Sequence, residues 1–144
     1  KILNAQRGNK FLTEVSFDRY RLIATCAPVL KSFLAVSQIQ KLAFKCNPLF
    51  TVQCVRKVLL ADNLTASLRV LELTDMGWTV ESLPPLVSAL RAAGLNRVLR
   101  SLFLDHNDFS VRPEEVDAAK RFAEFAKYLG SKDCVLKELG LRQT

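Results

Sequence analysis

A short apolar phrase, Leu-x-x-Leu-x-Leu in outline, recurs five times along this 144-residue chain. The copies begin at Leu12, Ile39, Leu68, Leu99 and Leu136, so their starts lie 27, 29, 31 and 37 residues apart. A period of this length is typical of proteins built from stacked supersecondary units, each of which buries its apolar side against its neighbours. The spacing therefore predicts a repeat array.

Each phrase predicts a short strand, because residues two apart point to the same side of a strand. Leu71 and Leu73, for example, should face the core, while the residues between them face the other way. About twenty residues separate one phrase from the next, which is too many for a hairpin turn. Successive strands should therefore lie parallel.

The stretches between the phrases have the spacing of amphipathic helices. In the third repeat Ser82 should cap such a helix and Gly94 should end it, while Pro113 and Gly130 should bound the helix of the fourth repeat. The apolar positions that define these two helical faces are Leu83, Leu86, Val87 and Leu90, and then Val116, Ala119, Phe122, Ala123, Ala126 and Leu129.

The fuller pattern Leu-x-x-Leu-x-Leu-x-x-Asn-x-Leu is matched best by residues 39–49 and 99–109, in which Asn47 and Asn107 take the asparagine position. Over residues 11–141 the chain resembles the leucine-rich repeat family, and more narrowly its ribonuclease-inhibitor-like subclass. The resemblance implies an α/β solenoid, a horseshoe with parallel strands on the concave face and helices on the convex face. It also implies that the two asparagines bind backbone groups inside the turns.

The other turn positions fit the pattern less regularly. Tyr20 and Met76 stand where asparagine is expected, and the position two residues later should be buried in each turn, at Leu22, Leu49, Trp78 and Phe109. A doubly wound parallel sheet is the alternative fold, but it predicts a glycine-rich phosphate loop, and the five scattered glycines form none.

We expect residues 1–144 to be a single leucine-rich repeat segment of about four repeats plus a fifth strand. Residues 2–8 read as the end of a preceding repeat's helix, and no helix follows the strand phrase at 136–141. These ends predict a segment of a longer repeat protein. The alternative is a small protein whose ends are covered by a partner.

The net charge of +7 lies entirely in residues 1–72. A basic surface attracts acidic proteins, nucleic acid and anionic membranes alike, so the charge does not select among them. Nucleic acid is the least favoured of these partners, because acidic residues interleave with basic ones in the second half of the chain and stacking aromatics are not spaced between them.

The cysteines show no C-x-x-C pairing, and the only histidine, His106, is distant from them in sequence. We therefore predict no metal site and no cofactor. Free thiols and the lack of a long apolar stretch favour a soluble, intracellular protein of the cytoplasm. The cysteines are Cys26, Cys46, Cys54 and Cys134.

The residues that alternate with the core positions of the strands should line the concave face and bind a partner. Phe103 is the clearest candidate, because an outward aromatic side chain costs solvation unless something covers it. The predicted contact residues are Lys41, Val70, Glu72, Ser101, Phe103 and Glu138, with Lys45 and Asp105 just beyond the strands.

This pattern predicts an interaction module and no enzyme, since His106 has no nucleophile placed to use it as a base. Relatives bind proteins on the concave face, so the resemblance implies a scaffold or adaptor for a protein partner in a cytoskeletal, regulatory or immune setting. The basic charge is compatible with an acidic partner. No small-molecule substrate and no membrane span are expected. The alternatives are a regulatory domain that activates a GTPase or inhibits an enzyme, and binding of nucleic acid through the basic first half.

Overall fold

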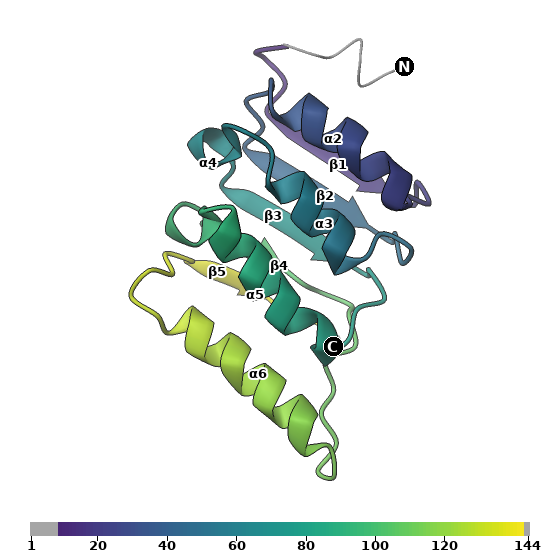
Figure 1. Cartoon of the computed structure of the whole chain (residues 1–144), viewed down its shortest axis with the longest axis vertical. Helices are drawn as coiled ribbons and strands as arrows, with labels where there is room; N and C mark the ends of the chain where they lie inside the picture. The colour runs from purple at the N-terminus through teal and green to yellow at the C-terminus, as the bar shows by residue number, and fades with distance from the viewer. Residues whose placement is uncertain (1–8, 143–144) are drawn as a thin grey trace.

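The computed structural model describes residues 9–142, and within this range five parallel strands form one sheet in the order β1-β2-β3-β4-β5 (Figure 1). Each strand pairs with the one before it in sequence, so the sheet grows at one edge only. The predicted α/β class with parallel strands is confirmed, whereas the expected helix end at residues 2–8 lies outside the described residues. The strands are β1 Glu14–Asp18, β2 Lys41–Lys45, β3 Val70–Thr74, β4 Ser101–Phe103 and β5 Glu138–Gly140.

The register of the sheet matches the sequence repeat position by position. Leu42 pairs with Val15 on one side and with Leu71 on the other. Leu102 likewise lies between Leu71 and Leu139. Equivalent residues of the phrase therefore stand side by side across the whole sheet, as the period predicts.

The helices form a single layer over one face of the sheet (Figure 1). Within it α2 packs against α3, α3 against α5 and α5 against α6. Because each helix connects the end of one parallel strand to the start of the next, its C-terminal end lies at the edge where the strands begin. The helices are α2 Ala27–Leu34, α3 Val52–Leu59, the short α4 Leu64–Ser67, α5 Leu83–Ala92 and α6 Val116–Leu129, with 3-10 turns η1 Ala24–Cys26, η2 Val80–Ser82 and η3 Leu95–Arg97.

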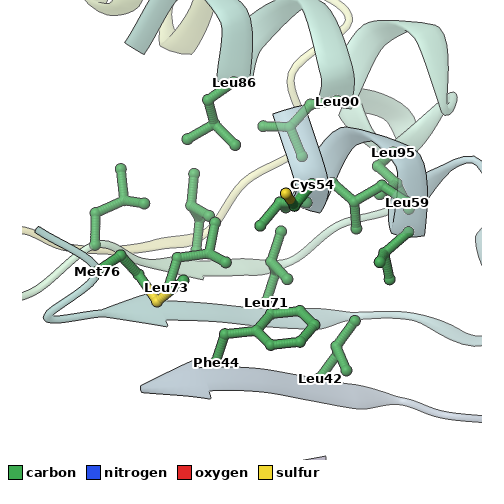
Figure 2. Packing of buried hydrophobic residues seen from close by; sticks show 14 of the residues in the cluster. Leu42, Phe44, Cys54, Leu59, Leu71, Leu73, Met76, Leu86, Leu90 and Leu95 are labelled. Carbon is green, nitrogen blue, oxygen red and sulfur yellow. The ribbon is translucent and has the colours of Figure 1, made fainter. Parts of the chain in front are cut away.

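The core lies between the sheet and this layer. Figure 2 shows Leu42, Phe44, Leu71 and Leu73 pointing from the strands toward the helices, and each of these side chains is fully buried. Leu86 projects from α5 to meet them. Burial of a large aliphatic or aromatic side chain stabilises the fold by about 1.5–3 kcal/mol, so the strand residues of the phrase and the helix residues that meet them both stabilise the core.

Two buried asparagines link successive turns after the strands. Asn47 accepts a hydrogen bond from the Leu22 amide through Oδ1 at 3.2 Å and donates through Nδ2 to the Phe17 carbonyl at 2.8 Å. Asn107 does the same two turns further on, after β4, where it accepts from the amides of Met76 and Trp78 in the turn after β3. Both predicted asparagine roles are confirmed, and each side chain satisfies backbone groups of the preceding repeat.

The face of α6 differs from the prediction. Its helical extent agrees, but Val116, Phe122 and all three alanines expected at the core are exposed, while Ala118, Phe125 and Tyr128 are buried. An alanine-rich helix offers two faces of similar hydropathy, and the face with the larger aromatic area packs inward.

Two details of the turns are also corrected. Leu49 is 62% exposed, and the adjacent Phe50 fills the core position instead, where its ring lies 5.1 Å from that of Phe44. Ser82 makes no side-chain cap, since it belongs to the turn η2 that precedes α5. Gly94 does end its helix, with a φ of +70° that favours glycine.

Candidate functional site

The face of the sheet that the helices leave uncovered carries all eight residues predicted to contact a partner. We call it the open face, and it consists of two rows on the strands and the residues just beyond them. The first row is Glu14, Lys41, Val70, Ser101 and Glu138, and the second is Ser16, Ala43, Glu72, Phe103 and Gly140. Lys45 is the last residue of β2, so it lies within the strand rather than just beyond it as predicted, and Asp105 lies two residues after the end of β4.

A hollow of about 380 Å³ lies on the open face over β2 to β5. Six of the eight predicted residues line it, while Val70 and Ser101 lie on the same face but outside the hollow. Its lining is Lys41, Lys45, Glu72, Phe103, Asp105, Glu138, Leu139, Gly140, Leu141 and Arg142.

A carboxylate with two lysines forms one side of the hollow. Glu72 Oε1 lies 2.8 Å from Lys45 Nζ, and its Oε2 lies 3.8 Å from Lys41 Nζ. The Thr74 hydroxyl is 3.5 Å from Oε1. The Glu72 side chain is only 15% exposed, so one carboxylate is held between two ammonium groups and this side of the hollow has a surplus of positive charge.

Phe103 occupies the other side of the hollow in a position that depends on a glycine. A Cβ atom at Gly140 would lie 2.6 Å from Phe103 Cδ1 and 2.8 Å from Asp105 Oδ2, so only glycine leaves room for both side chains. Phe103 is consequently half-buried rather than fully exposed as the alternation suggests, with its ring resting over β5.

The remaining carboxylates of the hollow also have fixed partners. Asp105 Oδ1 accepts a hydrogen bond from the Arg142 amide at 2.6 Å, which ties the end of β5 to the turn after β4. Glu138 Oε2 accepts one from the Ser101 hydroxyl at 3.0 Å. These contacts hold the charged groups in place before any partner arrives, although Glu138 remains exposed.

A further row at the strand ends was missed by the sequence reasoning. Four residues, one after each of the first four strands, occupy the same position of the repeat and have positive φ. They are Arg19 (57°), Cys46 (53°), Asp75 (52°) and His106 (60°). Cys46 Sγ donates to Asp75 Oδ2 at 3.2 Å. The shared offset of seven residues from each repeat start is the signal that could have revealed the row.

The thiol in this row is not activated as a nucleophile. The hydrogen bond to Asp75, reinforced by partial burial, raises the pKa of the Cys46 thiol above its ordinary value. Thiolate is the reactive form, so the thiol stays protonated at neutral pH.

Within residues 9–142 no three histidine, cysteine, aspartate or glutamate side chains come together in a way that could hold a metal ion. None of the helices in the same range has the length and apolar character needed to cross a membrane. Comparison of the chain with models of known protein families gives no match, and comparison with curated proteins gives none either.

Proposed function

We propose that the chain is a segment of a leucine-rich repeat solenoid of the ribonuclease-inhibitor-like subclass, with the strands on a concave face and the helices on a convex face. Addition of each strand at one edge and a single layer of helices are what such a solenoid requires. The hydrogen bonds that Asn47 and Asn107 make to the preceding turn support the same proposal.

In this proposal the segment is an intracellular scaffold or adaptor that binds a protein partner through the open face, and it works by binding rather than by catalysis. The observation that carries it is the hollow, where the half-buried ring of Phe103 stands among charged side chains that already have fixed partners. A surface ordered in advance loses little entropy on association, and an aromatic ring within it is a favoured anchor.

The charge of the hollow favours an acidic group on the partner. Lys41 and Lys45 share one carboxylate, that of Glu72, and the longer contact leaves Lys41 available for a second one. A partner carboxylate beside an apolar side chain would meet Lys41 and Phe103 together.

Site-specific photo-cross-linking tests the proposal. A photoreactive residue at Val70, on the open face, should give covalent adducts with a discrete protein in cell extract, and Phe103→Ala should reduce their yield. The same residue at Ser32, exposed on α2, serves as the matched control. Equal adducts from both positions, or adducts that Phe103→Ala leaves unchanged, would contradict binding through the open face.

A further inference from the structure

A band of basic side chains crosses the helix layer, on the side of the molecule opposite the open face. Each of the four longer helices carries at least one basic residue in its last turn. We call these residues the basic band: Lys31 of α2, Arg56 and Lys57 of α3, Arg91 of α5 and Lys127 of α6.

The helix packing places these last turns next to one another. The helices lie side by side in the order α2, α3, α5, α6 and run in the same direction (Figure 1). The Arg91 guanidinium lies 5.4 Å from the centre of the Tyr128 ring, so the ends of α5 and α6 are in direct contact. Beyond these ends, Arg97 and Asp133 approach to 3.9 Å. The basic residues therefore follow one another across the layer in the order of the helices, from α2 to α6.

The band is poorly neutralised by the protein itself. Helices α2, α3 and α5 contain no aspartate or glutamate at all. Among the described residues, Lys31, Arg56, Lys57 and Lys127 are exposed and form no ion pair with a carboxylate. At the other end of the layer, by contrast, Arg121 pairs with Glu81 at 2.9 Å.

Helix chemistry alone does not account for this arrangement. A cation in the last turn stabilises a helix by about 0.3–1 kcal/mol through the helix dipole, which explains one basic residue per helix. It does not explain the second cation of α3 or the lack of acidic residues elsewhere on three helices, since neighbouring cations repel one another.

A groove between α5 and α6 opens into the band. Its volume is about 710 Å³, and Arg91 and Lys127 stand on its walls above apolar side chains. Glu124 also lines it and offsets part of the positive charge. The complete lining is Pro84, Val87, Ser88, Arg91, Ala92, Glu124, Lys127 and Tyr128.

We propose that the basic band and this groove bind an acidic polypeptide segment, with carboxylates along the band and one apolar side chain in the groove. Two of the five cations are arginines, whose planar guanidinium groups match carboxylates in a bidentate manner. The partner is a polypeptide rather than single-stranded nucleic acid, because the aromatic ring at the band, Tyr128, is buried beneath Arg91 and provides no stacking surface. This site is separate from the open face.

Fluorescence anisotropy with synthetic peptides tests the proposal. The probe is a short labelled peptide of glutamate and aspartate residues around a central leucine. The double variant Arg56→Gln/Lys57→Gln should weaken its binding roughly tenfold, which corresponds to about 1.4 kcal/mol. Replacing the central leucine of the peptide with serine should weaken its binding as well, because the groove then loses its apolar contact.

A matched double variant distinguishes binding at the basic band from a general effect of net charge. Arg112→Gln/Lys120→Gln removes the same two positive charges from exposed positions near the start of α6, and it should change peptide affinity less than about twofold. Equal losses in both double variants would overturn the proposal. So would no peptide binding by the unchanged chain, tighter binding to duplex DNA or phosphatidylserine vesicles, or a leucine that makes no difference. Phe103→Ala should lower the peptide affinity less than Arg56→Gln/Lys57→Gln does, which distinguishes binding at the basic band from binding at the open face.

Discussion

Asn107→Ala should be among the most destabilising single changes to a polar residue in this chain. The side chain is 1% exposed and makes four strong hydrogen bonds to backbone groups. Oδ1 accepts from the amides of Met76 at 3.0 Å and Trp78 at 3.2 Å. Nδ2 donates to the carbonyls of Leu73 at 2.8 Å and Leu104 at 2.9 Å.

The magnitude follows from what alanine leaves behind. Two amides in the turn after β3 and the carbonyls of Leu73 and Leu104 would lose this partner, and each buried group left unsatisfied costs about 1–3 kcal/mol. Water entering the space recovers part of the loss, so we expect the free energy of unfolding to fall by about 3–5 kcal/mol. That is a large share of the total stability of a domain, about 5–15 kcal/mol.

Urea unfolding followed by tryptophan fluorescence measures this loss directly. Trp78 is the single tryptophan, and its amide is one of the groups that Asn107 binds. Asn96→Ala is the matched control, because Asn96 is half-buried and its contact with Val135 is made by its backbone carbonyl, which alanine retains.

The comparison between the two variants decides the outcome. If Asn107→Ala lowers the free energy of unfolding no more than Asn96→Ala does, the asparagine contacts do not hold the turns together. Asn107→Asp provides a second check, since it keeps the acceptor but places a negative charge beside two carbonyls. It should also destabilise the fold.

Three further outcomes can be measured with the same purified protein. Leu102→Ala removes a fully buried side chain and should lower the free energy of unfolding by about 2–5 kcal/mol. Phe103→Ala should weaken adduct formation at the open face with less than half that loss of stability. Equal losses for the two variants in urea unfolding would mean that Phe103 is a core residue. Gly140→Ala should lower the free energy of unfolding by about 1–3 kcal/mol, because its Cβ would lie 2.6 Å from Phe103 Cδ1. The double variant Gly140→Ala/Phe103→Ala should recover part of that loss. Strictly additive losses would show that the two positions do not clash. Burial raises the pKa of Tyr128 in the folded state. The contribution of this side chain to stability is therefore complete below about pH 10, where the tyrosine of the unfolded chain ionises, and is lost as the pH rises further. The free energy of unfolding of the unchanged chain should fall more steeply above that pH than that of Tyr128→Phe, and parallel curves would contradict the assignment.

The strand positions could be predicted because a single physical rule places them. Alternation along a strand assigns Leu71 and Leu73 to the core and Glu72 between them to the other face, and the repeat then gives the neighbours of each. The asparagine contacts were predicted from the resemblance to leucine-rich repeats, and they satisfy backbone groups of buried turns.

Side-chain contacts within the open face could not be predicted from the sequence in the same way. Nothing in the spacing of Lys41, Lys45 and Glu72 indicates that one carboxylate would hold both lysines, because that depends on rotamers across two strands. The packing of Phe103 over Gly140 likewise spans 37 residues of sequence. The prediction of the buried face of α6 was wrong for a different reason. Alanines distinguish the two faces of a helix only weakly, so the larger aromatic residues decide which face packs against the core.

The sheet and the helix layer together place the two candidate surfaces on opposite sides of one core. Their side chains are fixed by different elements: the hollow by contacts between neighbouring strands of β2 to β5 and their turns, and the basic band by the last turns of the helices. A partner on the open face would leave the groove between α5 and α6 uncovered, because the buried layer of leucines separates them. Binding at the two surfaces should therefore be nearly independent, as expected for sites with no shared contacts. Occupants of both surfaces would then be bound at once, and coupling between them would require the core itself to change its packing.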